Sequence, residues 1–570
     1  MVPAPTVPAV TVPVPAAEVR RILRMAIPSP ARLWTAIGFG VLSGGSAVAL
    51  LGVSAWLITR ASEQPALMYL SAAIVGVRAF ALGRAFFRYL ERLSGHDAAF
   101  RQLGTVRSRL YARLEPLAPD GLRGIRSGDL LTRLADDVDE LQNLALRVIQ
   151  PLVTAGIVVA GSVVVSVLIL PAAGVALFVT LLGALVAGVL VNRWAAGTAE
   201  RRIAPLRAAL NDALHDLAAN LDVLTAYDAL PAAQARVRAA SDRLTAASRA
   251  RAVGLGLTAG AVSLFAGVAT AWALAAGIPA LGTGALDAPS LAVVALLPLA
   301  VFEVFGTVPV AFGAWRSVRA SAERIASAAP DSAPGGIPVD APDAASLVVD
   351  GVPEVALDRV SAHWPDEDAA VLHDITLRLG PGERVLLTGP TGAGKTALAH
   401  VLTRLIDHTG GYRLDGVPVG DLRQDDVRRA VGLVEQRPYL FDSDLRQNLL
   451  FARDTATDDE LLAVLDRVGL REWALGRGGL SAAVGERGAL VSGGQAQRIA
   501  LARALLAGFP VLIVDEPTAN VDVEVADAIV RDVLTTAAED GRTVLLISHT
   551  DVPADLVDRT LHLEAGRIVS

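Results

Sequence analysis

The sequence predicts an α-helical transmembrane domain with six spans, followed by an α/β domain of the phosphate-loop (P-loop) type. Six apolar stretches that are long enough to cross a bilayer precede residue 320. After residue 350, short apolar strands alternate with amphipathic helices; the strands are predicted at Arg384–Thr388, Val431–Val434, Val511–Val514 and Thr543–Ile547. The first of them runs into a glycine-rich loop that ends in Lys395 and Thr396. A chain of 570 residues is also too long for one core, so at least two domains are expected.

The composition favours a membrane protein and excludes several other classes. Hydrophobic residues make up 53% of the chain and charged residues only 19%. The net charge of −7 argues against nucleic acid as the main partner. With no cysteine, the chain has no disulfide and no thiolate metal site.

The six apolar stretches define the predicted spans and their orientation. We place them at Leu33–Ile58, Pro65–Tyr89, Leu144–Leu170, Ala172–Val191, Val253–Ile278 and Leu291–Trp315. The two long connections, residues 91–140 and 192–251, are rich in arginine and are expected in the cytoplasm together with both termini. Their apolar residues recur every three or four positions, which predicts membrane helices that continue into the cytoplasm.

Changes in composition set the predicted domain boundaries. Residues 1–20 begin with a Pro-, Val- and Ala-rich stretch and are expected to form a disordered tail. The transmembrane domain is predicted over 21–327. A linker rich in Ala, Pro, Asp and Gly is predicted over 328–350, and a nucleotide-binding domain over 351–570.

A phosphate-binding loop lies between a predicted strand and a helix. Its residues are Gly389, Pro390, Thr391, Gly392, Ala393, Gly394, Lys395 and Thr396. Glycines let backbone N–H groups surround phosphates, and the helix N-terminus adds a favourable field. Lys395, the single lysine of the chain, is predicted to reach the β- and γ-phosphates of a bound nucleotide, and Thr396 to bind Mg²⁺.

A second motif predicts the catalytic carboxylates. The apolar run Val511–Val514 reads as a buried strand, and Asp515 and Glu516 follow at its carboxyl end, where open α/β sheets bind ligands. Asp515 is predicted to hold Mg²⁺, and Glu516 is the candidate general base for the attacking water. A solvated carboxylate pair is the alternative.

The residues between these motifs resemble those of ATP-binding cassette (ABC) proteins. The signature of that family is matched by Val491, Ser492, Gly493, Gly494 and Gln495. The resemblance further implies that Trp364 stacks on adenine, that Gln436 senses and binds Mg²⁺, that Asp522 is the D-loop aspartate and that His549 is the switch histidine. The predicted catalytic residues are then Glu516, His549, Lys395 and Gln436.

In that family the signature of one chain covers the ATP that is held by the phosphate loop of another. Ser492 and the N–H groups of Gly493 and Gly494 would form this second anion site at a helix N-terminus. One chain carries one half of each site, so the resemblance implies a dimer. Six spans followed by a cassette are similar to type IV exporters.

The stretch Arg84–Arg101 resembles the CydC side of the heterodimeric CydDC exporter family, as do Leu146–Leu152 and Phe302–Glu303. This resemblance implies a CydD-like partner in the bacterial cytoplasmic membrane. It also implies export of cysteine or glutathione, a link to cytochrome bd assembly and haem binding.

Charged residues near the second and sixth spans predict a substrate cavity. Charged groups at membrane depth are costly and usually face a cavity or a partner, so the candidates are Arg78, Arg84, Arg88 and Glu303. The alternative is that the arginines anchor at the membrane interface. By resemblance, His96 is the candidate axial haem ligand, with Arg92 one turn before it.

Two other functions remain open from the sequence. One is a homodimeric exporter of lipids or amphipathic drugs. The other is a non-transporting ABC regulator, in which ATP binding gates another protein.

Overall fold

The computed structural model describes residues 15–122, 133–191, 197–330, 335–347, 351–365, 367, 369–517, 523–549 and 552–569. The chain divides into two compact units. The first contains Met1–Tyr111 and Ser127–Ala329, and the second contains Ala112–Arg126 and Pro330–Ser570.

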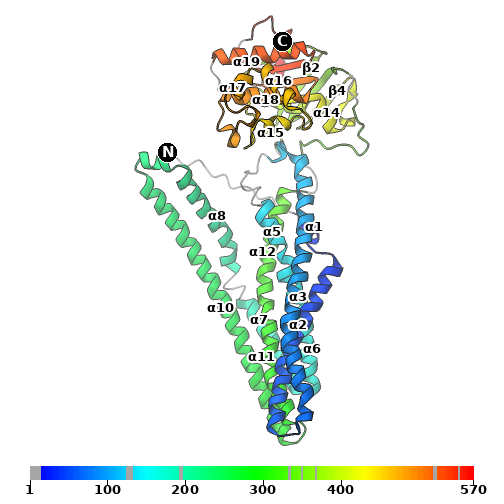
Figure 1. Ribbon diagram of the computed structural model, residues 1–570, viewed down its shortest axis with the longest axis vertical. Coiled ribbons are helices and arrows are strands. Elements are labelled where there is room, and N and C mark those ends of the chain that lie inside the picture. The colour runs from blue at the N-terminus through cyan, green and yellow to red at the C-terminus, as the bar shows by residue number, and fades with distance from the viewer. Residues whose placement is uncertain are drawn as a thin grey trace. The chain divides into compact units, whose positions relative to one another are not determined.

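The first unit is built from long apolar helices, and the described residues contain six that could span a membrane. They comprise α2 (Pro30–Ser62), α3 (Leu67–Leu114), α6 (Gln150–Ile169), α7 (Pro171–Val191), α10 (Leu230–Gly282) and α11 (Ala288–Phe305), which α12 (Thr307–Ala328) follows (Figure 1). This confirms the six predicted spans.

Two of these helices are much longer than a bilayer requires. Helix α3 has 48 residues and α10 has 53. At 1.5 Å per residue they are about 70–80 Å long, against a hydrocarbon core of about 30 Å. The prediction that membrane helices continue beyond the bilayer is therefore confirmed. The shorter helices α8 (Gly197–Ala219) and α9 (Leu221–Ala226) precede α10, and α8 packs beside it (Figure 1).

The third and fourth spans form a tight hairpin at Pro171. Leu170 is extended, with φ −148° and ψ 106°, and α7 begins at the next residue. A Cβ on Gly174 would lie 2.3 Å from the Val167 side chain, so glycine lets the two helices approach closely.

The prediction that residues 1–20 form a disordered tail is wrong for the last residues of this range. Helix α1 begins at Ala16 and runs to Met25, directly after Pro15. Helix α1 packs against α12. Val19 and Ile22 are buried and lie about one turn apart, so they share one face of α1. Arg21 donates a hydrogen bond to the carbonyl oxygen of Ala329.

The second unit contains a largely parallel six-stranded sheet in the order β10-β9-β3-β8-β7-β6. Its strands are β3 (Arg384–Thr388), β6 (Val431–Val434), β7 (Val511–Asp515), β8 (Thr543–Ile547), β9 (Arg559–Glu564) and β10 (Arg567–Val569). Strands β3, β6, β7 and β8 were all predicted, because each is a short apolar run buried on both faces.

A second, antiparallel sheet was not predicted. Its order is β2-β1-β4-β5, with β1 (Val355–His363), β2 (Ala370–Leu379), β4 (Thr409–Leu414) and β5 (Val417–Pro418). Along β1 and β2 buried residues are interrupted by exposed ones, so the apolar runs are too short to stand out from the sequence.

Helices surround these sheets in the second unit. They are α13 (Lys395–Leu402), α14 (Gln424–Ala430), α15 (Leu445–Leu450), α16 (Asp458–Arg467), α17 (Arg471–Leu475), α18 (Gly493–Ala507) and α19 (Val523–Glu539). Helix α13 follows β3, and α18 precedes β7. The carboxyl ends of β3, β7 and β8 therefore gather the loops that follow them, as open α/β sheets require for ligand binding.

Two segments outside the predicted 351–570 domain belong to the second unit. The described linker residues 335–347 attach to it: the Asp407 N–H donates to the Gly336 carbonyl (2.7 Å), and Ala345 bridges to Leu422. The short 3₁₀ turns Glu115–Leu117 and Asp120–Leu122, predicted within the 21–327 transmembrane domain, also lie in this unit.

Candidate functional sites

The phosphate loop has the backbone conformation that its glycines predict. Gly389, Gly392 and Gly394 have φ values of 151°, 83° and 104°. A Cβ on Gly389 would lie 2.1 Å from the carbonyl oxygen of Leu563, so only glycine fits there. Lys395 is 5% exposed, and its Nζ donates to the carbonyl oxygens of Gly389 (2.9 Å) and Pro390 (3.1 Å). The ammonium group is thus held directly over the loop.

Two of the three predicted magnesium ligands, Thr396 and Asp515, lie together, whereas the side chain of the third, Gln436, donates to Glu516. Thr396 Oγ1 donates to Asp515 Oδ2 at 2.9 Å. Burial raises the pKa of Asp515 above its ordinary value, while the hydrogen bond from Thr396 and the charge of Lys395 oppose that rise. Hydroxyl and carboxylate oxygens suit Mg²⁺, so Thr396 and Asp515 fit the ion and would hold it here.

Among the described residues there is no group of three His, Cys, Asp or Glu side chains that could hold a metal. Magnesium needs six oxygen ligands, and two protein oxygens leave most of them to water and to the phosphates of a nucleotide. The site is therefore suited to a metal ion that arrives with its nucleotide.

Glu516 lies at the centre of the predicted catalytic residues. Its carboxylate accepts a hydrogen bond from Gln436 Nε2, lies 2.5 Å from His549 Nε2, and lies 3.7 Å from Lys395 Nζ. The backbone of Glu516 is in the left-handed region, with φ 44°, a strained conformation typical of functional sites. The structure thus brings together all four residues that the sequence predicted as catalytic.

The adenine-stacking candidate Trp364 directly follows β1 and is half-buried against the core. Its ring meets that of His400, on α13, edge to face, with centroids 5.5 Å apart. The aromatic residue is therefore positioned beside the phosphate-loop helix. Asp522, the predicted D-loop aspartate, lies outside the described residues.

The signature forms the start of α18, a helix of 15 residues. Ser492 is the N-cap, its Oγ accepts from the Gln495 N–H at 3.3 Å, and the Gln495 side chain accepts from the Ser492 N–H at 2.9 Å. The exposed start of a long helix, opened by Gly493 and Gly494, is a suitable anion site. Val491 is half-buried and packs against the core.

A polar cavity of about 930 Å³ lies within the first unit. It brings together five of the predicted residues, which are Arg84, Arg88, Arg92, His96 and Glu303. Arg84 Nη2 and Glu303 Oε1 form an ion pair at 2.6 Å between α3 and α11. Arg78, the sixth candidate, is exposed and does not line this cavity, so its predicted role there is not supported.

The cavity also contains residues that the sequence analysis missed as site residues. Gln150 is 5% exposed and donates to Glu91 Oε1 at 3.0 Å. Thr154 is 9% exposed, and among the described residues its buried Oγ1 has no hydrogen-bond partner. Arg147 lies in a π-helix, Leu144–Ile149, a form that is frequent at functional sites. The resemblance of Leu146–Leu152 to the exporter family was the available signal.

The hydrogen bond of His96 sets its tautomer. Its Nδ1 lies 2.8 Å from the carbonyl oxygen of Arg92, which can only accept, so Nδ1 carries the proton. When the ring is neutral, its lone pair is on Nε2, which would be free to bind haem iron. With Arg88 and Arg92 nearby in the same cavity to pair with propionates, these residues fit haem.

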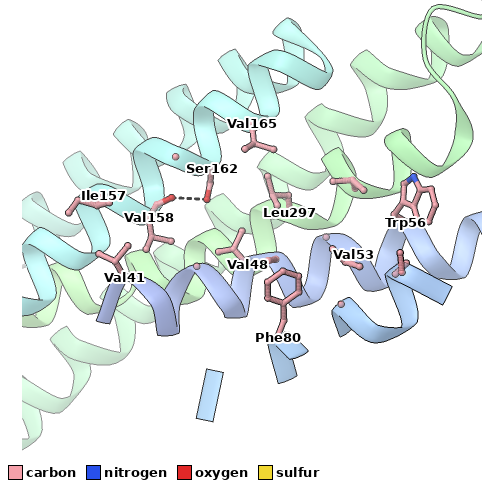
Figure 2. Close-up of a pocket in the computed structure, with 18 of the residues that line it drawn as sticks. Val41, Val48, Val53, Trp56, Phe80, Ile157, Val158, Ser162, Val165 and Leu297 are labelled. Atoms are coloured by element: carbon pink, nitrogen blue, oxygen red, sulfur yellow. Dashed lines mark hydrogen bonds between the residues drawn. The ribbon is translucent and has the colours of Figure 1, made fainter. Parts of the chain in front are cut away.

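A second pocket, of about 890 Å³, is apolar (Figure 2). Its walls include Val48, Trp56, Phe80 and Leu297, which come from α2, α3 and α11. The Ser162 hydroxyl donates to the Val158 carbonyl oxygen of its own helix at 2.8 Å and so adds little polarity. This pocket suits hydrocarbon.

Comparison with known proteins agrees with this geometry. Residues 372–519 match the family described as ABC transporter, and residues 33–303 match the ABC transporter transmembrane region. The fold is similar to a solved bacterial Atm1-family ABC exporter with ATP bound, with a TM-score of 0.78, 23% identity and coverage of 98% of this chain and 95% of that one. The protein is an ABC exporter chain with an ATPase coupled to transport.

More specific relatives share most of the chain. It is 32% identical to the glutathione/L-cysteine transport system ATP-binding/permease protein CydC of Escherichia coli K12, over 87% of this chain and 85% of that protein. It is 29% identical to the protein of the same system called CydD in Bacillus subtilis 168, over 94% and 93%. The chain therefore belongs to the family of type IV ABC half-transporters that includes CydC and CydD.

Proposed function

We propose that this chain is the CydC-like half of a heterodimer that exports cysteine- and glutathione-type thiols across the bacterial cytoplasmic membrane. The supporting observation is the polar cavity, in which Arg84, Arg88, Arg92 and Arg147 outnumber Glu91 and Glu303. Cysteine carries one carboxylate and one ammonium group, and glutathione carries two carboxylates and one ammonium group. Arginines suit the carboxylates, and the two glutamates suit the ammonium group. The nucleotide-binding domain and both termini lie in the cytoplasm in this proposal.

Reversing the charge of one member of the Arg84–Glu303 pair is expected to lower thiol flux by about five- to tenfold, because the substrate then meets a like charge. ATP-dependent uptake of radiolabelled cysteine and glutathione is measured in inverted vesicles that hold this chain and a CydD-like partner. The variants are Arg84→Glu, Glu303→Arg and the double variant, which restores the pair and should recover part of the flux.

Arg109→Glu is the matched control, because Arg109 is exposed on the same helix and does not line the cavity. No ATP-dependent thiol flux from the unmodified complex would refute thiol export and favour a non-transporting ABC regulator.

A homodimeric exporter of lipids or amphipathic drugs is the second candidate, and the apolar pocket beside α2 and α3 favours it (Figure 2). Expression of this chain without a partner distinguishes the two. A stable homodimer with full ATPase activity, stimulated by lipid and not by thiols, would support this candidate over the heterodimer.

We further propose that haem binds in the polar cavity with His96 as an axial ligand. His96→Ala is then expected to remove most of the Soret absorbance that haem gives on titration into the purified complex. His215→Ala, a change at an exposed histidine on α8 that does not line the cavity, should leave the Soret band unchanged. A Soret band that is unchanged in His96→Ala would exclude this ligand.

A further inference from the structure

A buried aspartate–histidine pair joins two distant segments of the second unit. Asp120 lies in a 3₁₀ turn a few residues after the end of α3, and His400 lies on α13, the phosphate-loop helix. Asp120 Oδ2 accepts from His400 Nδ1 at 2.5 Å, and the two side chains are 0% and 7% exposed. Burying such polar groups is costly unless they bond each other, so the pair fixes the turn to the helix.

The imidazole of His400 also contacts Trp364. The two rings meet at 79° with centroids 5.5 Å apart, the edge-to-face arrangement that aromatic pairs prefer. Because the Asp120 carboxylate fixes the rotation of the imidazole, it also restricts the plane of the indole. A second hydrogen bond, 2.9 Å between His363 Nδ1 and the Trp364 carbonyl oxygen, holds the backbone of the tryptophan.

The linker residues Gly336 and Ile337 pack close to the loop that carries Trp364. Gly336 has φ 86°, and a Cβ there would lie 3.2 Å from both His363 Cε1 and Pro365 Cα. The next residue, Ile337, is 6% exposed and packs against Gly121. A Cβ on Gly121 would lie 3.3 Å from the Ile337 side chain. The loop around Trp364 is therefore packed between the linker, the turn that carries Asp120, and α13.

We propose that Asp120 and His400 are positioning residues for ATP, which act by holding the Trp364 indole in the plane on which adenine stacks. Neither residue contacts the nucleotide in this account. The inference rests on the proposed role of Trp364 as the adenine platform. Through Trp364, the turn after α3 then influences how tightly the second unit holds ATP.

The test measures ATP hydrolysis by the reconstituted complex, with the partner's own site inactivated. Asp120→Ala and His400→Ala are each expected to raise KM for ATP by about five- to tenfold, since a buried hydrogen bond is lost, with kcat changed by less than about twofold. Inhibition by inorganic tripolyphosphate, which has no base to stack, should stay the same. Asp374→Ala, at an exposed aspartate paired with Arg567, is the control and should leave KM unchanged.

A merely structural role would give a different pattern. If the substitutions distort the phosphate loop, tripolyphosphate inhibition weakens together with ATP binding, and that result would overturn the proposal. Should the alanine variants fail to assemble, Asp120→Asn and His400→Gln keep most of the side-chain volume but weaken the hydrogen bond between the two residues. They are expected to raise KM by about threefold, and an unchanged KM would again overturn it.

Trp364→Ala separates this inference from the role on which it rests. In a Trp364→Ala background, His400→Ala should raise KM no further, because its effect passes through the indole. An unchanged KM in Trp364→Ala alone would refute the adenine platform. A raised KM in Trp364→Ala together with a normal KM in Asp120→Ala and His400→Ala would refute the positioning pair only.

Discussion

Replacing Glu516 with glutamine is expected to lower ATP turnover at this chain's site by at least about 100-fold, the contribution typical of a general base. The carboxylate accepts a hydrogen bond from Gln436 and lies 2.5 Å from His549 Nε2. The general base is therefore positioned between two residues that can orient water and phosphate. Glutamine has nearly the same shape and cannot take the proton. ATP binding should therefore survive, and ATP should accumulate unhydrolysed.

The measurement is phosphate release together with retention of radiolabelled ATP, in a complex whose partner carries the equivalent substitution at its own site. Glu539→Gln, at an exposed position at the end of α19, should behave as the unmodified protein. Turnover that persists in Glu516→Gln under these conditions would exclude Glu516 as the base.

Replacing Ser492 with arginine is expected to lower turnover at the partner's phosphate loop by about 100-fold, the loss typical when preorganised donors to a reacting anion are removed. Ser492 caps the exposed start of α18, and the long arginine side chain would fill the space that a triphosphate needs there. This chain's own site should be unaffected, because its phosphate loop and carboxylates are unchanged.

Pairing the two substitutions distinguishes the sites. Glu516→Gln should silence one composite site and Ser492→Arg the other, so the double variant should lose both activities. Thr455→Arg adds the same charge at an exposed loop residue and should have no effect. If Ser492→Arg instead impaired only the site formed by this chain's own phosphate loop, the exchange of signatures between two chains would be wrong.

Much of the fold could be predicted because its helices and strands follow from local patterns of apolar residues. The spans and strands β3, β6, β7 and β8 consist mostly of consecutive apolar residues, which local hydrophobicity reveals. Helix α1 was missed because its burial depends on α12, some 300 residues later. The antiparallel sheet was missed because its register depends on pairings between distant segments, such as Val355 with Leu414.

The residues of the candidate sites also fall into two groups, those that a local motif predicts and those that only the folded structure brings together. Gly389–Thr396, Asp515 and Glu516 could be predicted because phosphate chemistry requires those residue types next to a strand and a helix. The contact of Asp120 with His400 could not, because it joins residues 280 positions apart. In the first unit the sequence predicted Arg84, Arg88 and Arg92 but not Thr154, since a buried hydroxyl without a partner among the described residues is visible only in the packed structure.

We propose that ATP is hydrolysed between the phosphate loop of one chain and the signature of another. The most direct test is the ATPase rate per mole of this chain in detergent, measured over a dilution series with the oligomeric state recorded at each concentration. We expect the specific rate to fall towards zero as monomer replaces dimer, and to return when a CydD-like partner is added. A monodisperse monomer that hydrolyses ATP at the full specific rate at every concentration would show that the active site does not need a second chain.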